Sequence, residues 1–414
     1  MKTTLIFLFS LIFISPFYNC QDTLIDHNKK LNVFIDCDYC DITFIKQELT
    51  YLSYVRDRLL ADVHVQLVNQ NSGSGGEFYT FFFYGQHQLI GNNDTLELAV
   101  DVNQTSDEIR RSQMKIIQLG LVPYMIKLGY AQQLSLNVSG FENNETTTEK
   151  DPWNYWVFST NASGWFNGEE LYNSFNSYGS FRANRITEQY KIESRVGFNY
   201  NLSQFKVDEQ LIKSERKSQF GNLSVIKSIS DHWSAGVFSN VQSSLYNNYK
   251  FSGSFQGGLE YNIFPYEEST QRQIRFQYRI GGVHNLYNDT TVYNKLNETL
   301  GSHEINIGAE FQQKWGTVAG SVSGSHYFHN IKLNAVNFWL YLDLRLFKGL
   351  SWNVSGNLAF IHNQISLPME GSSSEDILLR QRQLQTGYRY WASTGITYTF
   401  GSIYNSVVNP RFGD

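Results

Sequence analysis

Cys37 and Cys40 form a residue pair whose spacing suggests chemistry. A C-x-x-C pair serves either as a redox disulfide or as half of a metal site. The chain has 3 cysteines and therefore no second pair, and the neighbouring Asp36, Asp38 and Asp41 disfavour a reactive thiolate. We predict a structural or incidental pair, with no bound metal or cofactor.

Nine charged residues form a second candidate site, because they lie between apolar neighbours in segments that alternate with period two. They are Glu193, Arg195, Glu260, Arg275, Arg279, Glu310, Asp343, Arg345 and Arg389. Alternate residues of a strand face opposite sides of a sheet, so these side chains are predicted to share a water-facing side. Interleaved charges of both signs there would either select small polar solutes in a pore or form a salt-bridged, closed interior.

The composition limits the class of protein that can carry these residues. The chain has 414 residues, a net charge of -5 and 15% aromatic residues, and its mean hydropathy is -0.35. This hydropathy, and the lack of a long apolar run after the N-terminus, exclude a bundle of transmembrane helices. The mild acidity argues against nucleic acid as a partner. The aromatic content is high for a single soluble core.

Residues 1–21 have the features of a cleaved secretory signal peptide. Lys2 provides a basic start, Leu5–Ile14 is an apolar stretch too short to span a bilayer, and a polar stretch follows. We therefore expect export from the cytoplasm. Lipidation of Cys20 is the alternative, but no lipobox-like sequence precedes it.

The sequence pattern of residues 28–130 predicts a small α/β domain with the order β-α-β-β-β-α. Helices are predicted after Asp41 and after the capping box Thr105–Glu108, with Pro123 kinking or ending the second helix. His64 is predicted at the surface or in a hydrogen bond, and Val55–Arg58 as an exposed connection or a partner contact. The predicted strands are Leu31–Cys37, Ala61–Leu67, Phe78–Tyr84 and Thr95–Val102.

Residues 150–402 alternate with period two over long segments, of which Ala335–Leu346 is the clearest. Strands of this length suit a tilted crossing of a bilayer. A soluble β-sandwich also alternates. The long strands, the 6 prolines and an alternation of short connections (such as 230–232) with long ones (204–216, 285–302, 364–386) instead favour an outer-membrane β-barrel. Twelve antiparallel strands are predicted, near 153–166, 174–187, 190–203, 217–229, 233–245, 251–264, 273–285, 303–314, 317–328, 333–346, 350–363 and 386–400.

The end of the predicted barrel resembles known outer-membrane proteins. Gly395, Tyr398 and Phe400 are similar to the C-terminal signal that barrel-assembly machinery recognises, although a tail at 403–414 follows here. With the run from Val55 to Val65 and the stretch from Thr399 to Gly413, the whole chain resembles uncharacterised outer-membrane β-barrel proteins of Bacteroidota. The resemblance implies a periplasmic α/β domain before the barrel, and no established activity.

Three functions are compatible with this architecture. The first is an anchor, in which the barrel lies in outer-membrane lipid and holds the periplasmic domain for an envelope partner. The second is a narrow solute channel with a gating or docking domain. The third is an enzyme, because His232 and Ser234 have the His-x-Ser spacing of outer-membrane phospholipases. That pair falls at a predicted periplasmic turn rather than on the lipid face near the outer leaflet, so we expect no enzyme.

Overall fold

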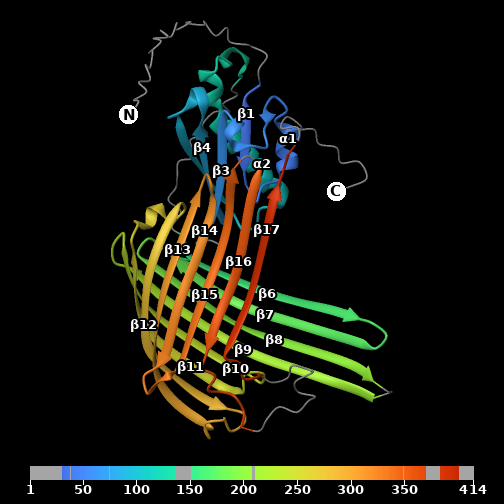
Figure 1. The fold of residues 1–414 in the computed structure, drawn as a ribbon, viewed down its shortest axis with the longest axis vertical. Helices are drawn as coiled ribbons and strands as arrows, with labels where there is room; N and C mark the ends of the chain where they lie inside the picture. Colours follow the sequence, from blue (N-terminus) through green and yellow to red (C-terminus); the bar gives the residue numbers. More distant parts are fainter. Residues whose placement is uncertain are drawn as a thin grey trace, which may run out of the picture.

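The computed structural model describes residues 30–37, 39–73, 75–135, 151–207, 210–347, 349–369 and 383–400. The predicted signal peptide with Cys20 and the tail at 403–414 lie outside these residues. The chain is mainly β, as predicted, and contains a five-stranded and a twelve-stranded sheet (Figure 1).

The α/β domain packs its helices on one side of the five-stranded sheet. The sheet has the order β2-β1-β3-β4-β5, in which β1 is parallel to β2 and β3 and the other pairs are antiparallel. Val63 and Val65 of β3, Phe81 of β4, and Ile117 and Leu121 of α2 lie in one buried core. The elements are β1 (Asn32–Asp36), α1 (Ile42–Glu48), β2 (Ser53–Tyr54), η1 (Arg58–Leu60), β3 (Val63–Asn71), β4 (Glu77–Gly85), η2 (His87–Leu89), β5 (Asn93–Val100), α2 (Ser106–Lys127) and η3 (Ala131–Gln133).

Two details of the domain differ from the prediction. The short strand β2 and the 3-10 turns are additions, since such brief elements leave no periodic pattern in the sequence. Of the two effects predicted for Pro123, a kink or an end of the helix, the second does not occur, because α2 continues through it to Lys127. The next residue, Tyr124, is buried and donates hydrogen bonds from its hydroxyl to the carbonyls of Phe83 (3.1 Å) and Asn92 (3.2 Å), which holds the last turn on the sheet.

The twelve-stranded sheet is an antiparallel meander in which every strand pairs with its neighbours along the chain. Twelve strands were predicted, and their positions agree closely. They are β6 (Trp156–Gly168), β7 (Tyr172–Ile186), β8 (Tyr190–Val207), β9 (Gln210–Ser228), β10 (Trp233–Ser244), β11 (Tyr249–Asn262), β12 (Arg272–Tyr287), β13 (Asn297–Gln313), β14 (Gly316–Tyr327), β15 (Asn330–Phe347), β16 (Leu350–Ile361) and β17 (Tyr388–Tyr398).

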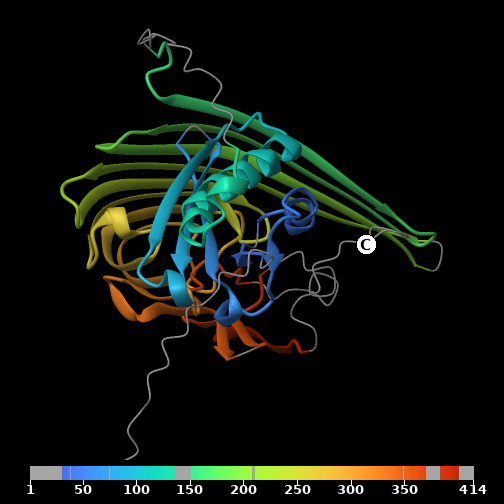
Figure 2. The same ribbon diagram turned by 90° about the horizontal axis from the view of Figure 1, so that it is seen from above.

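The sheet is strongly curved but open, which differs from the closed barrel that was predicted. Strands β6 and β17 are its two edges, and no pairing joins them within the described chain. Figures 1 and 2 show the hairpins of β6 to β9 extending away from β15 to β17. The period-two pattern specifies which neighbours pair along the chain, but it does not specify a contact between the first and last strands.

The connections are less asymmetric than the sequence indicated. Strand β8 runs to Val207 and β9 begins at Gln210, so residues 204–207 and 210–216 of the predicted long loop are strand. Longer connections occur at both ends of the sheet, at 263–271 beside the α/β domain and at 288–296 on the opposite end. The polar ends of these strands were predicted as loops because their exposed residues interrupt the alternation of apolar and polar residues.

The two faces of the sheet differ in character. Directly opposed residues of antiparallel strands share a face, and this register places all nine charged residues named above on one side, here called the inner face. The opposite, outer face exposes a continuous set of large apolar side chains. It includes Val196, Phe198, Leu223, Val237, Phe255, Leu259, Phe276, Ile280, Ile305, Ile307, Val322, Phe338, Leu340, Leu358 and Phe360.

Candidate functional site at the junction of the domain and the sheet

The α/β domain is fixed to the sheet by an ion pair between Asp36 at the end of β1 and Arg345 on the inner face of β15. Two guanidinium nitrogens of Arg345 donate to the two carboxylate oxygens of Asp36. His64 of β3 adds a contact of 3.2 Å between Nε2 and the same carboxylate. The Asp36 side chain is 11% exposed and Arg345 is 30% exposed, so the pair is largely shielded from water. Figure 1 shows the domain above the ends of β14 to β17.

Burial and hydrogen bonding together set the pKa values of Asp36 and His64. Burial opposes the charged form of Asp36, but hydrogen bonds from His64 and Arg345 outweigh it and hold the pKa of Asp36 below its usual value. Burial also lowers the pKa of His64, despite the opposing effect of Asp36. His64 is therefore neutral at pH 7, with Nε2 donating to Asp36. Its Nδ1 is buried without a hydrogen-bond partner, so a proton there would have no acceptor.

Three further contacts join the domain to the same end of the sheet. Gln66 Nε2 donates to the carbonyl of Gln313 (3.3 Å). Lys314, in the turn between β13 and β14, places Nζ 3.6 Å from the centre of the Tyr84 ring. Arg56 donates to the carbonyl of residue 400, just beyond β17, at 3.4 Å. The domain thus contacts the ends of β13 to β17 through several strands rather than through a single linker.

A polar cavity of about 300 Å³ lies beneath this junction. Asp36, Gln66 and Asn69 line it from the domain, and Glu310 and Asp343 are among the residues that line it from the sheet. Its walls carry carboxylates, amides and the guanidinium of the junction. The cavity shows that the domain covers the inner face at this end without filling it.

The structure divides the nine charged residues among several surroundings. Glu310, Asp343 and Arg345 line the junction cavity, whereas Glu193, Arg195 and Arg279 line a separate cavity farther along the inner face. Glu260 accepts hydrogen bonds from Tyr266 (2.8 Å) and Gln277. Arg275 and Arg389 line neither cavity. Whether this face encloses a lumen remains a prediction, as does the assembly signal at Gly395, Tyr398 and Phe400.

A chain segment packs on two loops at the end of the sheet opposite the domain. Ser366 and Leu367 are buried, and the carbonyl of Ser366 accepts a hydrogen bond of 2.8 Å from Asn248 Nδ2. The carbonyl of Leu367 accepts a further bond of 2.8 Å from the backbone of Val292. The segment thus links the turn at 245–248 with the loop at 288–296.

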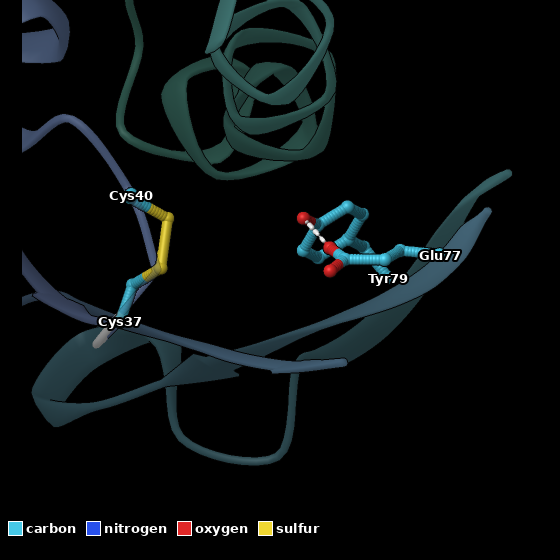
Figure 3. The surroundings of a disulfide bond; sticks show 4 residues. All are labelled: Cys37, Cys40, Glu77 and Tyr79. Carbon is cyan, nitrogen blue, oxygen red and sulfur yellow. Dashed lines mark hydrogen bonds between the residues drawn. A yellow bond between two sulfur atoms is a disulfide. The ribbon is translucent and has the colours of Figure 1, made fainter. Parts of the chain in front are cut away.

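Cys37 and Cys40 form a disulfide directly after β1 (Figure 3). The bond closes the loop between Asp36 and the start of α1, where Asp41 caps the helix by accepting from the backbone of Phe44 (2.8 Å). Glu77 and Tyr79 lie across from it, and the Tyr79 hydroxyl donates to Glu77. The disulfide is thus placed where it constrains the residue that binds Arg345.

The side chains of His232 and Ser234 have different hydrogen-bond partners. Nδ1 of His232 lies 2.8 Å from the carbonyl of Asn262, and the hydroxyl of Ser234 lies 3.0 Å from that of Tyr266. Ser234 is opposite Glu260 and therefore on the inner face. The serine hydroxyl is thus paired with a tyrosine and not with His232.

The sequence interpretation missed the main role of β3. His64 was predicted at the surface or in a hydrogen bond, and it is hydrogen-bonded to Asp36 but buried. Gln66 is buried on the same face, because the twelve-stranded sheet covers it. Phe34 and Tyr84 meet His64 edge-on, with ring centres 5.1 and 5.8 Å from that of the imidazole. These rings belong to other strands, so no local pattern around position 64 indicates a covered face.

Among the residues that the structure describes, no group of three or more His, Cys, Asp or Glu side chains is arranged to hold a metal ion. No helix in the same residues is both long and apolar enough to cross a membrane. No protein-family model and no curated protein matches the chain.

Proposed function

We propose that the chain is an outer-membrane protein whose twelve-stranded sheet closes into a barrel and anchors the α/β domain on the periplasmic side for binding or assembling an envelope partner. The observation that supports it best is the largely shielded Asp36–Arg345 pair, which fixes the domain to the inner face of the sheet. A domain attached in this way has a defined position relative to the membrane, and an anchor requires this.

The outer face supports the membrane part of the proposal. Soluble monomers rarely expose apolar patches larger than a few hundred Å², and this face presents large apolar side chains on many adjacent strands. In lipid, backbone groups of an open sheet edge would have no hydrogen-bond partners. Closure between β6 and β17 would satisfy them, and the even number of strands makes that pairing antiparallel.

Cell fractionation with site-specific photo-crosslinking tests the anchoring role. Tyr39 is 65% exposed on the domain, and Ile331 is 70% exposed near the opposite end of the sheet. A photo-crosslinker at position 39 should yield a defined adduct with an envelope protein in intact cells, and one at position 331 should not. A chain found in the soluble fraction, or equal adducts at both positions, would contradict the proposal.

A narrow solute channel is the second candidate, favoured by the charged inner face and its cavities. The purified chain in a planar bilayer distinguishes the two roles. An anchor whose inner face is covered by the domain should show no stepwise current. Ion-selective current that changes in Arg279→Ala would instead establish the channel.

A further inference from the structure

Three arginines from three strands face one recess of the inner face. Arg182 of β7, Arg195 of β8 and Arg279 of β12 line a cavity of about 340 Å³. Asn184, Asn222 and Asn240 line the same cavity and supply side-chain amides. The volume lies in the range of small-molecule sites, which begins at roughly 300 Å³.

Protein carboxylates balance the positive charge of this recess only in part. None of the three arginines has an ion-pair partner among the described residues. Glu193 is the carboxylate that lines the cavity, and Lys191 already approaches it at 3.3 Å. Glu304 is directly opposed to Arg279 on β13 but does not line the cavity, so the three arginines still outnumber the nearby carboxylates. The recess therefore carries a net positive charge.

Strand register makes this charge unfavourable without a ligand. Arg182 and Arg195 are directly opposed on β7 and β8, and like charges in that position destabilise a sheet. The Nε atom of Arg195 is also buried without a hydrogen-bond partner. A bound anion would screen the repulsion and accept from the unpaired donor.

Aromatic rings hold two of the guanidinium groups in place. The guanidinium carbon of Arg279 lies 3.9 Å from the centre of the Phe238 ring, and that of Arg195 lies 5.4 Å from the Phe220 ring. The Tyr178 hydroxyl accepts a further hydrogen bond from Arg195. Stacked guanidinium groups lose less freedom when they bind a ligand.

We infer that this recess binds a phosphate group, either free or on a small soluble solute. Guanidinium groups bind phosphate through paired, charge-assisted hydrogen bonds. Three of them from different strands suit a tetrahedral anion with oxygens in several directions better than a planar carboxylate. The recess lies on the face opposite the apolar one, so the phosphate comes from solution and not from a lipid headgroup. This site goes beyond the anchoring role and needs no partner protein.

Calorimetric titration of the full-length chain with inorganic phosphate, in a non-ionic detergent at constant ionic strength, tests the inference. The wild type should bind saturably at one site. Arg182→Gln, Arg195→Gln and Arg279→Gln should each raise the Kd about tenfold or more, as expected for the loss of charged hydrogen bonds. Arg275→Gln is the matched control, because Arg275 is on the same strand and face as Arg279 but outside the cavity.

Thermal unfolding separates a binding role from a structural one. In phosphate-free buffer Arg182→Gln should be at least as stable as the wild type, because it removes a like-charge pair. Phosphate should raise the Tm of the wild type and not that of the variant. Three results would overturn the inference. The first is an absence of saturable phosphate binding, and the second is an equal loss of phosphate affinity in Arg275→Gln. The third is competition by phosphatidylglycerol vesicles but not by free phosphate. None of these results depends on the photo-crosslinking outcome.

Discussion

At the scale of single residues, Asp36 connects the two parts of the molecule. It ends β1, precedes the disulfide and binds both His64 and Arg345. Removing one partner from a shielded ion pair leaves the other charge buried and unpaired, which is more damaging than removing both. The junction therefore permits a sharp energetic test.

Arg345→Met should lower the free energy of unfolding of the full-length chain by about 3 kcal/mol, the low end for a buried pair because Arg345 is 30% exposed. Urea unfolding in detergent micelles measures the loss. The double variant with Asp36→Asn should lose less than the sum of the two single variants. Arg389→Met, on the same face at the far end of β17, is the control. Additive losses would contradict the pairing.

The stability of the junction should depend on pH through His64. Because the folded pKa of His64 is below its usual value, the folded state binds fewer protons than the unfolded state below about pH 6.5. Stability should thus be constant near pH 7–8 and fall as the pH drops below about 6.5. Asp36, whose folded pKa is lowered, stabilises the fold above about pH 4 and contributes a further loss only below it.

Thermal unfolding of the full chain between pH 5 and 8 measures this dependence. His64→Gln keeps a donor for Asp36 but cannot titrate, so its profile should be flatter between pH 5 and 6.5. An unchanged slope in this variant would assign the pH dependence to other groups.

At the scale of elements, α2 depends on a close approach to the sheet at Gly120. A Cβ atom there would lie 2.0 Å from the ring of Phe83, which is fully buried in β4. The helix cannot move away, because Tyr124 is hydrogen-bonded to the carbonyl of Phe83 one turn later.

Gly120→Ala should therefore destabilise the domain by about 1–3 kcal/mol through overpacking, although alanine is the better helix former. Leu119→Ala is the control on the same helix, since Leu119 is 43% exposed. Chemical unfolding followed by near-UV circular dichroism compares the two. A Gly120→Ala variant more stable than the wild type would show that the helix can shift.

Helices and strands with a regular alternation of apolar and polar residues were predictable from the sequence. Their contacts with distant elements were less predictable. The capping box at Thr105 and Glu108 begins α2 as expected, and the strand positions follow the alternation. The burial of His64 was not predictable, because it depends on a surface more than 200 residues away along the chain. Local patterns specify strands and faces, whereas contacts between distant elements leave no local signature.

At the scale of the whole molecule, β6 and β17 are the open edges of the sheet in the described chain, and closure requires these two strands to pair. Antiparallel pairing of β6 with β17 would bring inner-face residues of the two edge strands together. Ser355 and Ser393 are directly opposed on β16 and β17, so they provide a positive control for cross-linking.

Cysteines at Ser393 and at one of Ser159, Asn161 or Ser163 should form a disulfide in outer-membrane vesicles if the barrel closes. Mass spectrometry of non-reduced peptides identifies the bond. The Ser355/Ser393 cysteine pair should cross-link in every preparation. If the Ser355/Ser393 pair cross-links and none of the β6 cysteines does, the sheet remains open in these vesicles.

The sequence by itself determined the mainly β class, the twelve antiparallel strands and the separation of charged from apolar residues on alternate positions. These features depend on short-range periodicity, which the chain carries at every strand. Only the tertiary structure decided that the α/β domain docks on the sheet, that Asp36 binds Arg345, and that three arginines share one recess. Each of these depends on residues far apart in the chain, and the physical cause is burial and charge pairing between surfaces that no local pattern specifies.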